Sequence, residues 1–135
     1  MATVWPMATF AQAPQPPTYV LLIARLGGAA EAPGPGDLDG FGFVTVSLFS
    51  QQQTICATGL VFNIGQQTGA PIHQGAVGEA GPVVVDLSQL RQGCIGNVAP
   101  ALIQAISANP AGCYVNVHTA EFPNGAVRGH LSAAP

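Results

Sequence analysis

Three histidines are the side chains in this sequence best suited to coordination chemistry: His73, His118 and His130. Neutral imidazole nitrogens are common ligands of zinc and copper, and three that converge on one point can hold either ion. The sequence therefore offers a candidate zinc or copper site at these residues. The alternative is a hydrogen-bonded polar cluster that holds loops together, with Asn116 and Arg128 as partners of the histidines.

Three cysteines, Cys56, Cys94 and Cys113, form a second group of reactive side chains. No two of them are separated by the gap of about two to four residues that is typical of zinc sites. An odd number of cysteines in an exported protein is compatible with one disulfide and one free thiol. We therefore expect one disulfide, and the spacing does not decide which two cysteines form it.

Arg128 lies among apolar or small neighbours in a segment that is predicted to be a strand. A buried guanidinium needs hydrogen-bond acceptors, because an unpaired buried charge is costly. We therefore expect Arg128 to bond to backbone carbonyls or to a carboxylate such as Glu31, Glu79 or Glu121. In that position it would hold loops together and bind no ligand.

Sequence signatures of catalysis are missing from the chain. There is no Gly-x-Ser-x-Gly elbow, the motif that presents a nucleophilic serine. Gly34-Pro35-Gly36 precedes a predicted strand and not a helix, so it is interpreted as a turn and not as a phosphate-binding loop. We expect no enzymatic activity, and no cofactor beyond the candidate zinc or copper.

Charge is scarce in this chain of 135 residues. Charged residues make up 7% and hydrophobic residues 48%, with a net charge of -3, whereas an ordinary soluble domain is about 25% charged. The length is that of one domain with one core. Scattered arginines without lysines provide no basic patch, which argues against nucleic acid and anionic membrane surfaces as partners. No apolar run reaches the roughly 18 residues of a transmembrane segment.

The N-terminal 13 residues are mostly apolar and end in a small-x-small pattern of the kind that signal peptidase cleaves. We interpret residues 1–13 as the remnant of a secretion signal. The alternative is an N-terminal arm, which could also add a strand to a neighbouring subunit. Residues 14–17 contain three prolines and are predicted to form a stiff spacer. The folded domain then spans residues 18–135.

Most of the domain is predicted to form short strands separated by Gly/Pro turns. We expect strands over residues 19–26, 41–49, 54–64, 82–87, 113–119 and 126–132. The first of these is so apolar that it should be buried on both faces. The aromatic residues are expected in the core: Phe41, Phe43, Phe49, Phe62 and Tyr114.

One helix is predicted over residues 100–108. Asn97 is a candidate for its N-terminal cap, and Leu102 with Ile106 would form its apolar stripe. Together with the strands, this pattern predicts an all-β fold. We expect an antiparallel β-sandwich with Greek-key-like topology and one short helix near residues 100–108.

The last two strands are predicted to form a hairpin, in which Gly125 supplies the left-handed residue of the turn. A two-residue loop would place Val117 opposite a polar residue. A three-residue loop places Val117 opposite Leu131 and His118 opposite His130. We expect the second register, because it keeps apolar residues opposite apolar residues. It also brings two histidines side by side.

Two segments of the chain resemble the signatures of the CHRD (chordin-type) domain family. The first is residues 113–119 followed by 122–131, and the second is residues 72–75 followed by 81–85. With weaker likeness at Leu26-Gly27-Gly28, Glu31 and Asp39-Gly40, the resemblance spans roughly residues 18–132. It implies an extracellular β-sandwich of the kind found in bacterial secreted proteins and in an animal antagonist of secreted growth factors. No established enzymatic activity comes with it.

The chain departs from the family pattern at three positions. Pro71 stands where the family usually has the first histidine of a His-Ile-His, and His130 stands where it usually has glutamine. Cys113 replaces a residue that is commonly aromatic. The last departure marks Cys113 as the extra cysteine, so the resemblance implies a disulfide between Cys56 and Cys94.

The low charge also indicates how the protein interacts. Apolar surface that is not buried inside the domain must face a partner, and the open edges of a sandwich can pair with another chain. We therefore expect a secreted, non-enzymatic extracellular module with a structural, self-assembling or binding role. Its expected partners are further copies of itself and other extracellular proteins or polymers. The alternative function is zinc or copper binding at the three histidines.

Overall fold

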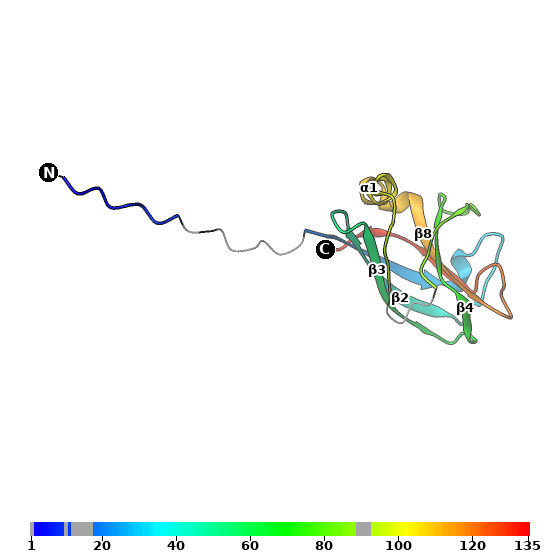
Figure 1. Cartoon of the computed structure of the whole chain (residues 1–135). Coiled ribbons are helices and arrows are strands. Elements are labelled where there is room, and N and C mark those ends of the chain that lie inside the picture. The colour runs from blue at the N-terminus through cyan, green and yellow to red at the C-terminus, as the bar shows by residue number, and fades with distance from the viewer. Residues whose placement is uncertain (1, 10, 12–17, 89–92) are drawn as a thin grey trace.

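The computed structural model describes residues 2–9, 11, 18–88 and 93–135 of the chain. Figure 1 shows the domain that these residues form. Two 3-10 turns, Gly28–Ala30 and Pro110–Gly112, accompany one α-helix, α1 (Pro100–Ala108). The strands of the described residues are β1 (Val20–Gly27), β2 (Phe41–Phe49), β3 (Thr54–Phe62), β4 (Gln67–Gly69), β5 (Pro71–Gln74), β6 (Val83–Asp86), β7 (Gly93–Ile95), β8 (Cys113–Thr119), β9 (Val127–His130) and β10 (Ser132–Ala133).

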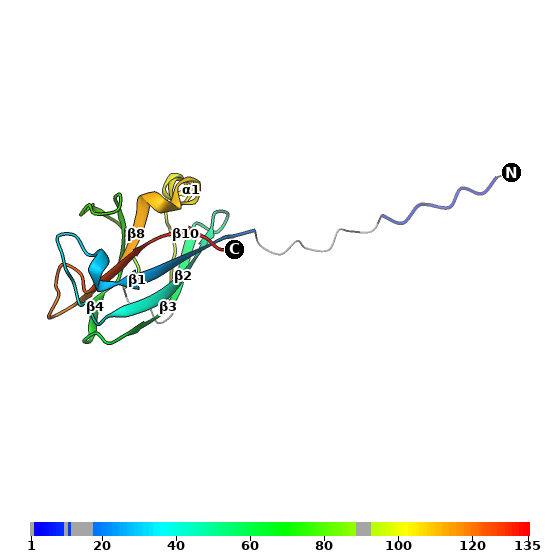
Figure 2. The same cartoon turned by 180° about the vertical axis from the view of Figure 1, so that it is seen from behind.

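These ten strands join into one antiparallel sheet. The order is β6-β5-β8-β9-β1-β2-β3-β7, with β4 also paired to β8 and β10 also paired to β1. The sheet curls into a half-barrel, as both views show (Figures 1 and 2). The predicted all-β antiparallel fold with one short helix is confirmed. The strands form a single continuous sheet, in which opposite parts of the curl take the place of the two layers of a sandwich.

The core lies on the concave side of the curl, where alternate residues of β1, β2 and β3 are buried. From β1 these are Leu22, Ala24 and Leu26, and the inner residues of β2 and β3 join them in one cluster. Helix α1 adds Ile103 and Ile106, both almost fully buried. Leu102, which was predicted to lie on the buried stripe of the helix, packs only partly against the core.

The N-terminal end of α1 also differs from the prediction. The helix is capped at Ala99, which makes no side-chain hydrogen bond to the first turn. Asn97 has a left-handed backbone with φ of 57°. It therefore belongs to the turn that precedes the helix and does not act as its cap. Pro100 occupies the first helical turn. Backbone N–H groups there have no acceptor within the helix, so the lack of an N–H in proline costs no hydrogen bond.

The convex face of β1–β3 corrects two predictions. β1 is buried on one face only, because Leu21 is exposed while Leu22 is buried. Phe41, Phe43 and Phe62 were expected in the core but remain 52%, 44% and 48% exposed. The outward face of β2 carries Thr45 and Ser47 besides its phenylalanines, whereas the inward face carries Val44, Val46 and Leu48. The smaller Val and Leu side chains fill the narrow inner side, and the phenylalanines lie outside.

The register between β8 and β9 differs from both predicted registers. Val117 lies opposite Val127, and Tyr114 lies opposite His130. The connection is longer than expected because two turns follow each other. One is closed by the Thr119 hydroxyl, which accepts from the Phe122 N–H, and the other by the Gly125 N–H, which donates to the Phe122 carbonyl. Gly125 has the predicted positive φ, at 132°.

The disulfide joins Cys56 of β3 to Cys94 of β7 across directly paired positions. This is the pairing that the family resemblance implied. Cys113 is a free thiol and is buried. The cross-link ties the edge strand β7 to the sheet, where only three residue pairs connect the two strands.

The N-terminal residues 2–9 form neither helix nor strand and are exposed. In both views they extend away from the domain (Figures 1 and 2). The predicted spacer at residues 14–17 lies outside the described residues, as do residues 1, 10, 12 and 13 of the predicted arm. Among the described residues, no helix is both long and apolar enough to cross a membrane.

Candidate functional site

A layer of polar side chains covers the outer face of β5, β8 and β9. Because side chains alternate along a strand, Tyr114, Asn116 and His118 of β8 point to the same face, opposite to the core residues between them. The pairing of the strands adds cross-strand neighbours to this face. We call this group the polar layer; it consists of His73, Tyr114, Asn116, His118, Arg128 and His130.

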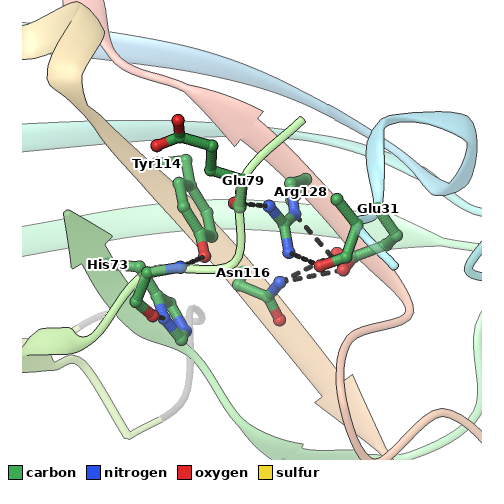
Figure 3. A network of polar contacts seen from close by, with 8 residues as sticks. Glu31, His73, Glu79, Tyr114, Asn116 and Arg128 are labelled. Atoms are coloured by element: carbon green, nitrogen blue, oxygen red, sulfur yellow. Dashed lines mark hydrogen bonds and ion pairs between the residues drawn. The ribbon is translucent and has the colours of Figure 1, made fainter. Parts of the chain in front are cut away.

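Arg128 is the centre of the polar layer and is 2% exposed. Its Nε donates to a carboxylate oxygen of Glu31 at 3.3 Å. Its two terminal nitrogens donate to the backbone carbonyls of Glu79, at 2.7 Å, and Ala32, at 3.0 Å. The guanidinium also lies over the ring of Tyr114, 4.1 Å from its centre. Figure 3 shows that these contacts connect the loops that carry Glu31 and Glu79 to the sheet.

Glu31 is the only buried carboxylate among the described residues, at 6% exposure. The amide nitrogen of Asn116 donates to both of its oxygens, at 2.9 and 3.0 Å (Figure 3). Burial raises the pKa of Glu31, and the charge of Arg128 and the hydrogen bond from Asn116 act in the opposite direction. The contacts of Glu31 with Asn116 of β8 and Arg128 of β9 therefore anchor the loop that follows β1 to both strands.

The predicted bonding of Arg128 is confirmed, since it bonds to one carboxylate and to two carbonyls. Of the three candidate acids, Glu31 provides its side chain and Glu79 its backbone carbonyl. The predicted structural cluster of Asn116 and Arg128 exists, but Asn116 binds Glu31 and not a histidine. The stacking of Arg128 on Tyr114 was missed. The alternation of polar residues in 114–118 was the signal that could have found it.

The three histidines do not converge on one point. His73 stacks on one side of Tyr114, with ring centres 4.8 Å apart, while His130 lies 5.3 Å from the same ring. His130 uses its Nε2 to donate to the Gly75 carbonyl at 3.0 Å. His118 lies near His73, with ring centres 6.2 Å apart. Tyr114, and not His118, is the strand partner of His130, so the observed register separates the predicted trio.

No group of three or more His, Cys, Asp or Glu side chains that could hold a metal ion occurs in the described part of the chain. The structure thus brings together His73 and His118 of the predicted metal ligands. It places His130 apart from them, in a hydrogen bond of its own.

Burial sets the protonation of two side chains near the layer. The pKa of His118 is lowered, first by desolvation and then by the charges of His73 and Arg128, while Asp86 opposes the shift. Desolvation raises the pKa of the Cys113 thiol. These shifts favour the neutral form of His118 and the protonated thiol of Cys113, which makes Cys113 a poor nucleophile.

A small pocket of about 180 Å³ lies between α1 and the sheet next to Cys113. Its lining is mixed, with Gln74 and Asn109 as polar members and Leu102 and Ile106 as apolar ones. Among the described residues of its lining, Cys113 is the only titratable one, so none of them is a base that could activate this thiol.

The comparison with known families agrees with the signatures in the sequence. A family model for the CHRD domain matches residues 22–131, which include strands β2–β9, most of β1 and all the residues of the polar layer. No curated protein and no solved structure matches the chain. The match covers most of the sequence, and the chain therefore belongs to the CHRD-domain family.

Proposed function

We propose that this protein is an extracellular, non-enzymatic module that associates with further copies of itself through the convex face of β1–β3. The observation that carries this proposal is the set of large apolar side chains exposed on that face. We call it the aromatic face; its exposed members are Tyr19, Leu21, Phe41, Phe43, Leu60 and Phe62.

The aromatic face is continuous across neighbouring strands. Phe41 of β2 lies opposite Phe62 of β3, with ring centres 5.3 Å apart. Phe43 lies opposite Leu60, which is 66% exposed. Isolated exposed apolar side chains are ordinary, but a contiguous group of this kind marks an interaction surface. The cross-strand packing shows that Phe41, Phe43, Leu60 and Phe62 form one patch. Tyr19 and Leu21 lie at the other end of the same face, beyond Thr45.

The electrostatics of this face favour a second copy of the chain as its partner. Arg25 is the only charged residue in β1, β2 and β3. A partner with a strongly charged surface would therefore find little electrostatic complementarity here. An equally apolar sheet face would be complementary to it. Two sheets pack face to face at a distance of about 10 Å when their facing side chains are apolar. A two-fold axis would bring the same patch from two molecules together.

The extracellular part of the proposal is supported by the family and by the disulfide between Cys56 and Cys94. Disulfides persist in oxidising compartments and are rare in the cytosol. The non-enzymatic part is supported by the buried clamp around Arg128. Its polar groups are used in bonds between loops and strands and are not presented to a substrate.

The experiment compares the mass of the protein in solution with that of a variant of the aromatic face. Sedimentation equilibrium of the wild type should show a dimer or a larger species that dissociates on dilution. The double variant Phe43→Thr/Leu60→Thr should be monomeric at the same concentrations, because threonine keeps the strand propensity and removes the apolar area.

The matched control is the double variant Leu38→Thr/Val77→Thr. Both residues are large, apolar and exposed, at 69% and 82%, but they lie outside the aromatic face. This variant should associate like the wild type. A wild-type protein that is monomeric at all concentrations contradicts the proposal. So does a control variant that dissociates as readily as the variant of the aromatic face.

A further inference from the structure

We propose that His73 and His118 form a two-imidazole binding site for one zinc or copper ion on the outer face of the sheet. His130 is not part of it. The two rings lie beside each other, with centres 6.2 Å apart and planes at 28°. The site is separate from the aromatic face, which lies on β1–β3, so it does not depend on the proposed self-association.

The hydrogen bond of His73 determines which of its nitrogens faces the site. Its Nδ1 lies 2.7 Å from the Gly81 carbonyl oxygen. A carbonyl oxygen only accepts hydrogen bonds, so Nδ1 carries the proton and Nε2 of the neutral ring carries a lone pair. A backbone carbonyl that orients a histidine through its other nitrogen is the usual outer-shell arrangement of a metal ligand.

Three buried polar atoms in this part of the layer make no hydrogen bond with any described residue. They are His73 Nε2, His118 Nε2 and Asn116 Oδ1. Asn116 lies between Tyr114 and His118 on the same face of β8, and the His73 ring contacts the rings on both sides of it. The three side chains therefore lie on one face of the sheet, with the His73 ring close to that of His118.

Two of these three atoms are acceptors when the His73 ring is neutral. His73 Nε2 is then an acceptor for the reason given above. Asn116 Oδ1 is one because the amide nitrogen of the same side chain donates to both oxygens of Glu31. Buried acceptors without a donor are costly, and a cation satisfies them directly. Imidazole nitrogens select zinc and copper among the common metal ions, with Asn116 Oδ1 or water available as a further ligand.

The strand opposite His118 leaves space beside the pair. Gly69 is the register partner of His118. A side-chain carbon built at Gly69 would meet no atom within 4 Å. The position that pairs with His118 on β4 is therefore not filled by a side chain.

Titration of the metal-free full-length protein with ZnCl₂ and, separately, CuCl₂ tests the site by calorimetry. The wild type should bind one equivalent of at least one ion, with copper the tighter of the two. The variants His73→Gln and His118→Gln should each weaken this binding by about 10–100-fold or more. The matched control His130→Gln should bind like the wild type, because His130 Nε2 is already used by Gly75.

A second readout does not depend on variants that must fold. In nitrogen NMR of the imidazoles, saturating zinc should shift the Nε2 signals of His73 and His118 and leave those of His130 in place. The proposal is wrong if neither ion binds stoichiometrically. It is also wrong if His130→Gln weakens binding as much as the other two variants, or if the His130 signals shift and the paired ones do not.

Discussion

Arg128 stabilises the fold by neutralising and fixing Glu31, the buried carboxylate of the loop that follows β1. We predict that Arg128→Met lowers the free energy of unfolding by about 3–5 kcal/mol at neutral pH. The reason is that this change leaves the Glu31 charge buried without its partner. Urea unfolding followed by circular dichroism measures the loss. Arg25→Met is the matched control: Arg25 is exposed, so its replacement should change stability by no more than about 0.5 kcal/mol.

The pH dependence of the same variant identifies Glu31 as the cause. Burial raises the pKa of Glu31 in the folded state, and the loss of Arg128 should raise it further. A folded state that holds this proton more tightly than the unfolded chain gains stability as pH falls through the raised pKa. The deficit of Arg128→Met relative to the wild type should therefore shrink on acidification. A deficit that stays constant or grows would point to lost packing instead.

Cys113 should behave as an inert thiol in the folded protein. It is buried, and burial raises its pKa, so little reactive thiolate is present. We predict that a disulfide reagent such as DTNB labels no thiol in the native protein within the time needed for full labelling in denaturant. Rapid stoichiometric labelling without denaturant would show that the pocket beside α1 admits the reagent to the sulfur.

At the residue scale, the sequence was sufficient to predict the contacts of a side chain that can satisfy its polar groups in few ways. A guanidinium among apolar neighbours needs acceptors, and this requirement predicted the carboxylate and carbonyl partners of Arg128. The histidines could not be placed in the same way. Their contacts depend on the register of β8 with β9, and on the turns at Thr119 and Gly125 that set this register.

The disulfide fixes the edge strand β7 to β3. Cys56 and Cys94 are 38 residues apart in the sequence, so the bond closes a long loop. We predict that Cys56→Ala/Cys94→Ala lowers the free energy of unfolding by about 3–4 kcal/mol, largely by freeing the unfolded chain. Chemical unfolding measures this loss. A reductant should lower the unfolding free energy of the wild type by a similar amount and leave that of the double variant unchanged. If the reductant destabilised both proteins equally, the loss would not come from this disulfide.

At the scale of elements, segments with clear boundaries were predictable. Strand 41–49 and helix 100–108 have the predicted limits, because a turn or a proline stands at each end. The short strands β4, β5 and β7 were not predicted, since three or four residues show no periodicity and are held by their neighbours in the sheet. The inner face of β2 was not predicted, although Thr45 and Ser47 mark the opposite face as the more polar one, because the phenylalanines on that face suggested burial.

At the scale of the whole molecule, the chain has more large apolar side chains than one small curled sheet can enclose. The concave side is filled by side chains of β1–β3, β5, β6, β8, β9 and α1, and Phe41, Phe43 and Phe62 remain outside. Low charge in the sequence predicted that such surface would exist. Only the structure shows that it is gathered on β1–β3, and the proposed self-association follows from this arrangement.

The most direct test of the proposed function is to locate the contact surface between copies by the concentration dependence of amide NMR spectra. The account predicts shifts that grow with concentration and map to β1, β2 and β3, with the largest changes near Phe43 and Leu60. Signals from α1 and from the polar layer around Arg128 should stay in place. Spectra that do not change with concentration, or shifts that map to α1 or β6 and spare β1–β3, would contradict the account.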